Sequence, residues 1–153
     1  MPLRFAIPGR PLELERLVLD VNGTLTDRGA LLDGVAELLA RVAANASVHL
    51  LSADTFGTLE ETAATLGVEA RRVAGGDEKL LVVEELGAAR CAAVGNGAND
   101  ALMLEAAALG IAVLGPEGAS ARALSAADVV CRSAAEALEL LLDERALVAT
   151  LRR

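Results

Sequence analysis

The stretch Asp20–Thr26, with the sequence DVNGTLT, decides how this chain folds. It follows directly on Leu17–Leu19, a short apolar run that is typical of a fully buried strand. A carboxylate at the end of such a strand, followed by glycine and threonine, predicts a loop at the carboxyl edge of a parallel sheet. Ligands bind at that edge in open α/β sheets. Polar residues at the ends of the other strands are therefore candidates for the same site.

Outward from this stretch, apolar strands alternate with amphipathic helices. The predicted strands are Leu17–Asp20, Val48–Leu51, Ala70–Val73, Cys91–Val94, Ile111–Leu114 and Val129–Cys131. The predicted helices begin at Asp33, Asp54, Glu78, Asn99, Glu117 and Ser133. This alternation indicates a three-layer Rossmann-like α/β fold, with a parallel sheet covered on both faces. We expect one domain over residues 1–153, with a β-hairpin at 1–16 and the Rossmann-like core at 17–153.

Composition excludes several classes of protein. The chain of 153 residues has 14 Lys and Arg against 22 Asp and Glu, a net charge of −8, and neither Trp nor Tyr. Nucleic-acid binding is therefore not expected, since it needs a basic face or aromatic stacking. No apolar run reaches the roughly 18 residues of a membrane span. Residues 1–10 do not resemble a secretory signal, and Cys91 and Cys131 form no CxxC pair, so a cytoplasmic location is expected.

Three further polar features fall at predicted strand ends or helix starts. Ser52 ends the second strand, and the loop Gly95–Asp100, GNGAND, follows the strand Cys91–Val94. Lys79 opens the third helix of the core and is the one lysine among the 14 basic residues. A compact ammonium charge has a role that arginine cannot fill. A carboxylate, a hydroxyl, an ammonium and a Gly/Asn/Asp loop are thus expected at one edge of the sheet.

This set of residues resembles the haloacid dehalogenase-like (HAD) superfamily, whose signatures DxDGT and GDGxND are similar to DVNGT and GNGAND here. The most similar branch is the small, soluble, P-type-ATPase-like phosphatases. The resemblance implies that Asp20 is a nucleophile that forms an aspartyl-phosphate, that Ser52 holds a phosphoryl oxygen, and that Lys79 neutralises charge. Only about 27 positions separate Ser52 from Lys79, and a short loop joins Asn22 to Asp33, so no cap domain is expected.

The same resemblance implies a Mg²⁺ site and a phosphate site. Mg²⁺ would be held by Asp20, the backbone carbonyl of Asn22 and Asn96, with Asp100 as a supporting carboxylate. The implied phosphate-binding residues are Gly23, Thr24, Ser52, Ala53, Lys79 and Asn99. The implied partner is a small phosphorylated substrate or a phosphoprotein. A second subunit could supply a lid over an open site.

Two positions depart from the signatures, because Asn22 and Asn96 stand where the superfamily usually has Asp. An amide at position 22 can neither protonate a leaving group nor activate water, a contribution worth about 10²–10⁴-fold. A neutral amide at position 96 is a weaker Mg²⁺ ligand. We therefore expect slow hydrolysis that favours good leaving groups. The alternative function is a weakly active or inactive HAD-like domain that binds a phosphorylated ligand or a protein partner.

Each residue also has a purely structural explanation. Asp20 could cap a turn at the end of its strand, and Lys79 could be a solvated helix residue. His49, the one histidine, is expected to be a hydrogen-bonded core or edge residue. Asp33 and Asp54 are expected to cap helices. The enzymatic interpretation therefore depends on whether Asp20 and Lys79 meet in one anion pocket.

Overall fold

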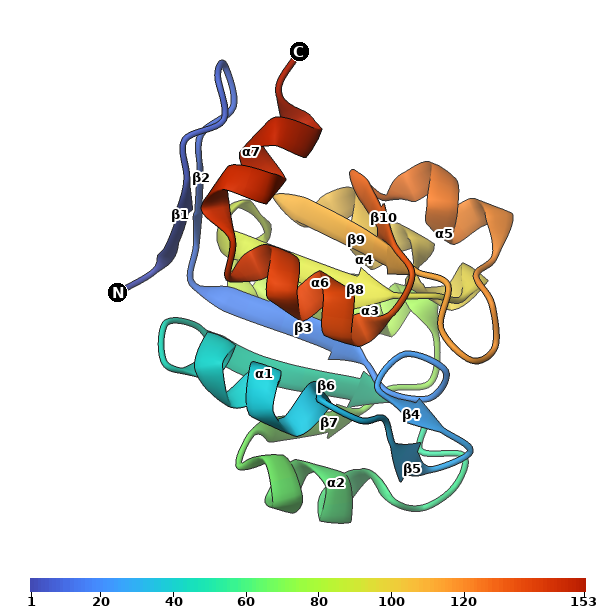
Figure 1. Ribbon diagram of the computed structural model, residues 1–153. Coiled ribbons are helices and arrows are strands. Elements are labelled where there is room, and N and C mark those ends of the chain that lie inside the picture. Colours follow the sequence, from blue (N-terminus) through green and yellow to red (C-terminus); the bar gives the residue numbers. More distant parts are fainter.

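A computed structural model describes all residues from 1 to 153 and has a six-stranded parallel sheet at its centre (Figure 1). The sheet order is β10-β9-β8-β3-β6-β7, and every pair of neighbours is parallel. The strands are β3 Arg16–Asp20, β6 Ser47–Ser52, β7 Glu69–Arg72, β8 Cys91–Gly95, β9 Leu109–Val113 and β10 Val129–Cys131. The chain moves from β3 outward to β7 and then crosses to β8, so the switch in strand order lies at β3.

Helices cover both faces of the sheet (Figure 1), which confirms the predicted three-layer α/β fold. One face carries α1 Val35–Ala43, α2 Leu59–Leu66, α6 Ala134–Leu141 and α7 Glu144–Leu151. The other carries α3 Gly76–Leu86, α4 Ala101–Ala106 and α5 Ala121–Ala126. No cap domain interrupts the core, as expected. No helix is long and apolar enough to cross a membrane.

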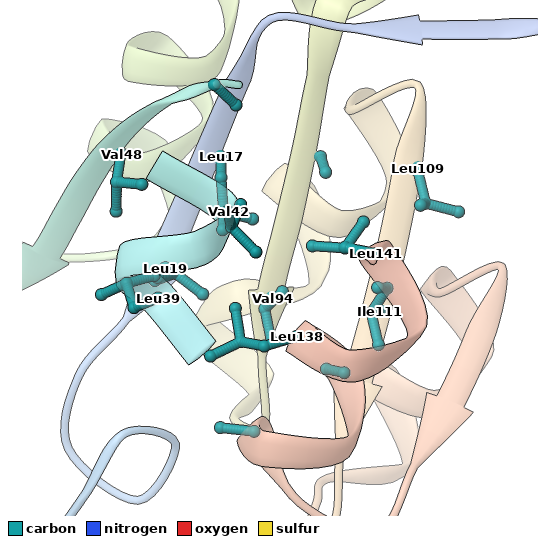
Figure 2. Close-up of a cluster of buried hydrophobic side chains, with 14 of the residues drawn as sticks. Leu17, Leu19, Leu39, Val42, Val48, Val94, Leu109, Ile111, Leu138 and Leu141 are labelled. Atoms are coloured by element: carbon teal, nitrogen blue, oxygen red, sulfur yellow. The ribbon is translucent and has the colours of Figure 1, made fainter. Parts of the chain in front are cut away.

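The alternation of side chains along β3 divides the core in two. Leu17 and Leu19 are buried under α1 and α6, in the cluster drawn in Figure 2. Val18 points to the opposite face and packs with residues of α3 and α4. Because both faces of a central parallel strand are buried, its sequence is continuously apolar until Asp20. This packing fixes the position of the carboxylate at the strand end.

The N-terminal hairpin forms as predicted. Strands β1 (Leu3–Phe5) and β2 (Leu12–Leu14) pair antiparallel, and the hairpin lies beside α7 (Figure 1). Phe5 and Leu14 are buried in the same cluster as the α1 face of the sheet. At the hairpin turn, the Arg10 guanidinium contacts the Asp128 carboxylate at 3.1 Å. The hairpin thus extends the hydrophobic core at the end of the sheet opposite Asp20.

Several predicted boundaries were wrong. The loop after the first signature contains a small hairpin, with strands β4 (Thr26–Asp27) and β5 (Ala30–Leu31). Asp33 caps no helix, since Gly34 in the left-handed conformation (φ 81°) precedes α1. A helix was expected over Asn99–Leu109, but α4 ends at Ala106 and Leu109 begins β9, because buried strand pairing with β8 outweighs the helical pattern. Glu117, predicted to open a helix, lies in a loop, and α5 begins at Ala121.

Candidate active site

The site lies where β3, β6 and β8 end side by side. Asp20 is the last residue of β3, Ser52 the last of β6 and Gly95 the last of β8. The register pairs β3 with both neighbours along its length, so the three strands end at the same edge. Asp20 and Ser52 are both buried, with 7% and 3% of their surface exposed. The fold therefore gathers polar side chains in a place where water is largely excluded.

A buried ammonium group joins two carboxylates. The Lys79 Nζ donates to Asp20 Oδ1 at 2.8 Å and to Asp100 Oδ1 at 2.6 Å. Lys79 lies in the first turn of α3, and it is the largest of the fully buried side chains. A charge that is removed from water is tolerated only when it is paired and hydrogen-bonded. The geometry brings Asp20 and Lys79 together, as the enzymatic interpretation requires.

Burial is the main cause that raises the pKa of Asp20, to about 6. The charge of Asp100 acts in the same direction, whereas Lys79 and the Thr24 hydroxyl oppose the rise. Burial alone would lower the pKa of Lys79, but the two carboxylates outweigh it, so this pKa lies above its usual value. Asp20 is therefore ionised above about pH 6, and Lys79 remains charged beside it.

The loop after β3 folds tightly around Asp20. The Val21 carbonyl accepts hydrogen bonds from the amides of Thr24, Leu25 and Thr26, at 2.8–3.1 Å. This turn directs the Thr24 hydroxyl to Asp20 Oδ2 at 2.9 Å, so each carboxylate oxygen of Asp20 has one donor. Gly23 lies in the left-handed region, with φ 77°. The Asn22 side chain is half-buried, and its Oδ1 accepts from the Thr26 hydroxyl at 3.4 Å.

Ser52 keeps its hydroxyl proton available. Its Oγ accepts a hydrogen bond from the Asp54 amide at 2.9 Å, and the hydroxyl donates to no protein atom. Asp54 adopts a left-handed φ of 59°, and its Oδ1 accepts from the Leu59 amide at 3.0 Å. Asp54 thus bonds to the start of α2 as expected, but the helix begins five residues later, at Leu59. Ala53 between them is exposed.

The second signature is held together by Asp100. Its Oδ2 accepts from the amides of Asn96 and Gly97, at 3.0 and 2.9 Å, while Oδ1 binds Lys79. Asn96 Oδ1 lies 3.1 Å from the Thr24 hydroxyl, which links the two signature loops. Asn99 is exposed and makes no side-chain hydrogen bond, so the structure does not bring it into this network. The fully buried Asp100 supports the loop rather than facing the opening of the site.

A divalent cation fits the donors that remain. The Asn22 backbone carbonyl accepts no hydrogen bond, unlike that of Val21. With Asp20 and Asn96 Oδ1 it makes an all-oxygen set, and hard cations such as Mg²⁺ prefer oxygen ligands. No cluster of three or more His, Cys, Asp or Glu side chains is placed to hold a metal. The protein therefore offers few charged ligands, and a bound Mg²⁺ would keep several waters.

Glu117 is the residue near the site that sequence reasoning missed. Its carboxylate lies against Gly23, so a Cβ at Gly23 would collide with Glu117 Oε2. The signal was in the sequence, because Pro116 and the flanking Gly115 and Gly118 are typical of a loop rather than a helix. His49, in contrast, lies within β6 away from the strand end, and its ring Nε2 lies 3.1 Å from the Ser47 Oγ. It is a half-buried, hydrogen-bonded residue of an interior strand.

Comparisons with known proteins place the chain in a family. The model of haloacid dehalogenase-like hydrolases matches residues 12–108. The chain belongs to this family. It is also 44% identical, over 78 residues, to an uncharacterized protein of Methanocaldococcus jannaschii, a match that covers 48% of this chain and 84% of that protein.

Solved structures of two phosphatases and of a zinc-transporting ATPase share the fold. The cobalt-bound deoxy-D-mannose-octulosonate 8-phosphate phosphatase of Haemophilus influenzae aligns with a TM-score of 0.70 and 18% identity, over 84% of this chain and 87% of that one. The corresponding phosphatase of Moraxella catarrhalis, in complex with magnesium, phosphate and KDO, gives 0.66 and 17%, over 91% and 94%. A zinc-transporting PIB-type ATPase gives 0.66 and 26%, over 78% of this chain and 20% of that one. The HAD core is thus common to all three.

Proposed function

We propose that this HAD protein is a Mg²⁺-dependent phosphohydrolase that forms an aspartyl-phosphate on Asp20. The observation that carries the proposal is the buried contact of Lys79 Nζ with Asp20 Oδ1 at 2.8 Å. A cation held beside a strand-end carboxylate lets a phosphate dianion approach that carboxylate despite their like charges. Membership of a hydrolase family supports the same activity.

The reaction proceeds in two displacements. A carboxylate oxygen of Asp20 attacks the phosphorus of a phosphate ester, the new O–P bond forms, and the bond to the leaving oxygen breaks. Water then attacks the phosphorus of the acyl-phosphate, which releases inorganic phosphate and restores the Asp20 carboxylate. The free Ser52 hydroxyl and Lys79 are the donors for the phosphoryl oxygens. Phosphoryl transfer depends mostly on such positioning and charge stabilisation.

Asn22 makes both displacements slow. Its amide cannot donate a proton to the leaving oxygen, and it cannot take one from the attacking water. The leaving group therefore departs without help, which favours acyl, aryl or nucleotide phosphates over alkyl phosphates. Asp100 cannot substitute as the acid, since it is fully buried and bonded to Lys79, Asn96 and Gly97.

Mg²⁺ would be held by Asp20, the Asn22 carbonyl and Asn96, and it would add positive charge beside the transferred phosphoryl group. Asp20 would hold the ion through its carboxylate, which Thr24 and Lys79 orient. The substrate is a small phosphorylated molecule, a class that includes the octulosonate 8-phosphate of the Haemophilus and Moraxella phosphatases. The absence of a cap also leaves room for a phosphoprotein, or for a second copy of the chain as a lid.

Hydrolysis of an activated aryl phosphate, with and without Mg²⁺, tests the proposal. Asp20→Asn is the matched control, because it keeps the shape of the side chain and removes the nucleophile. We expect Mg²⁺-dependent release of phosphate by the parent and none by the variant. Equal rates in the two proteins would refute the role of Asp20. Phosphate binding without turnover in the parent would instead favour the alternative, a binding domain, which the two Asn substitutions support.

A further inference from the structure

The loop Leu114–Ser120, which follows β9, packs directly on the loop after Asp20. Gly23 has no side chain, and Glu117 Oε2 occupies the space that a Cβ would take. Gly115, with φ 52°, lies as close to the first signature, since a Cβ at Gly115 would collide with the Gly23 carbonyl oxygen. Two glycines thus let the loop that follows β9, two strands away from β3 in the sheet, reach the first signature.

Asn96 fastens this loop to the second signature. Its side-chain Nδ2 donates to the Gly118 carbonyl at 3.0 Å, and its backbone carbonyl accepts from the Ser120 amide at 2.8 Å. A carboxylate in place of the amide would have no proton to donate and would repel the Gly118 carbonyl. Asn96, which is a weaker metal ligand than Asp, is therefore also the residue that holds the loop in place.

The loop carries a carboxylate that has no protein partner. Glu117 is exposed, and its carboxylate makes no hydrogen bond and no ion pair with the protein. Its Oε2 and the Asn96 Nδ2 both lie against the position that a Cβ of Gly23 would take. An unpaired negative charge thus lies beside Gly23 and the Asn96 amide, in the two signature loops that carry the donor oxygens.

We propose that Glu117 supplies the negative charge that Asn96 lacks at the divalent-cation site, acting on the water shell of the ion. The inference rests on the proposed function, because it assumes that the cation binds at Asp20. Mg²⁺ gives up its waters reluctantly, so a carboxylate at the rim can hold the ion without direct contact. The two residues act together. The Asn96 amide holds the Leu114–Ser120 loop in place, and Glu117 in that loop provides the negative charge that a carboxylate at position 96 would have provided.

Titration with Mg²⁺ by calorimetry, without substrate, tests this role, and Mn²⁺ binding followed by electron paramagnetic resonance gives a second readout. Outer-shell groups at metal sites are typically worth about 10–100-fold in affinity. We expect Glu117→Gln to weaken cation binding about tenfold and Glu117→Asp, which keeps the charge, to retain most of it. Glu139→Gln is the control, since it removes the same charge from an exposed position on α6.

Equal cation affinity in the parent and Glu117→Gln would overturn the inference and leave the proposed function intact. The inference also fails if Glu139→Gln weakens binding as much as Glu117→Gln, because the effect is then one of net charge. A parent that binds no divalent cation, while Asp20 still accepts a phosphoryl group, would remove the metal from the proposed function as well. Thermal unfolding of each variant separates loss of affinity from loss of the fold.

Discussion

Replacing Asp20, the proposed nucleophile, should make the protein more stable while it abolishes the proposed activity. The pKa of Asp20 is about 3.8 in the unfolded chain, and burial raises it to about 6 in the folded protein. A group whose pKa rises on folding binds its proton more tightly in the folded state, so the stability of the protein falls as pH increases between those values. At about 1.4 kcal/mol per pKa unit, the ionised Asp20 lowers the free energy of unfolding by about 3 kcal/mol at neutral pH.

The variant Asp20→Asn removes this penalty. Its amide oxygen can still accept from Lys79, and Asp100 remains to balance the ammonium charge. Because Lys79 loses one charged partner, we expect a net gain of about 1–3 kcal/mol in the free energy of unfolding at about pH 8. At about pH 4 Asp20 is largely protonated in the folded state, and the gain should nearly vanish.

Urea denaturation of both proteins at these two pH values measures the gain. Asp54→Asn is a control for which the opposite change in stability is expected, because the Leu59 amide and then Arg72 hold the pKa of Asp54 below its usual value. That variant should be less stable than the parent above about pH 4, with the difference shrinking on acidification. If Asp20→Asn is less stable than the parent at about pH 8, or equally stabilised at both pH values, the electrostatic account of the site is refuted.

Three other substitutions have definite expected outcomes. Asn22→Asp restores an acid and should speed hydrolysis of an alkyl phosphate, by up to about 10²–10⁴-fold; no acceleration in a sample whose mass excludes deamidation would contradict the account of Asn22. Lys79→Met leaves two buried carboxylates without a cation and should lower the free energy of unfolding by about 3–5 kcal/mol in urea denaturation. A loss below about 1 kcal/mol would mean that the ammonium is not essential to the pocket. Asn96→Asp removes the donor to the Gly118 carbonyl and should destabilise the Leu114–Ser120 loop by about 1–3 kcal/mol, which would be seen as faster proteolysis of that loop. An unchanged rate of proteolysis would argue against the hydrogen bond of Asn96 holding the loop in place.

The sequence was sufficient to predict the sheet and the edge at which the site forms. Leu17–Leu19 is a short apolar run typical of a buried strand, and the alternation of strands and helices that follows leaves few topologies. The strand Val129–Cys131 was predicted with the boundaries that the structure shows, and Ser133 accepts from the Glu136 amide as a cap. Signature residues were found because each follows an apolar strand directly.

What escaped prediction depended on contacts between distant loops. Glu117 reaches the site because Gly23 and Gly115 lack side chains, and neither glycine reveals its partner along the sequence. The contact of Asn96 with this loop is hidden for the same reason, since its amide donates to the Gly118 carbonyl, 22 residues away. Helix boundaries failed at Leu109 and Asp33, where strand pairing and a left-handed Gly34 overrode local patterns.

The identity of the phosphorylated residue tests the central claim most directly. Parent protein is mixed with an aryl or acyl phosphate and Mg²⁺ and quenched in acid, which preserves acyl-phosphates, and its peptides are then mapped by mass spectrometry. We predict one added phosphoryl group on the peptide that contains Asp20, and none in Asp20→Asn treated in the same way. A phosphoryl group on any other residue, or none at any time during turnover, would contradict the mechanism.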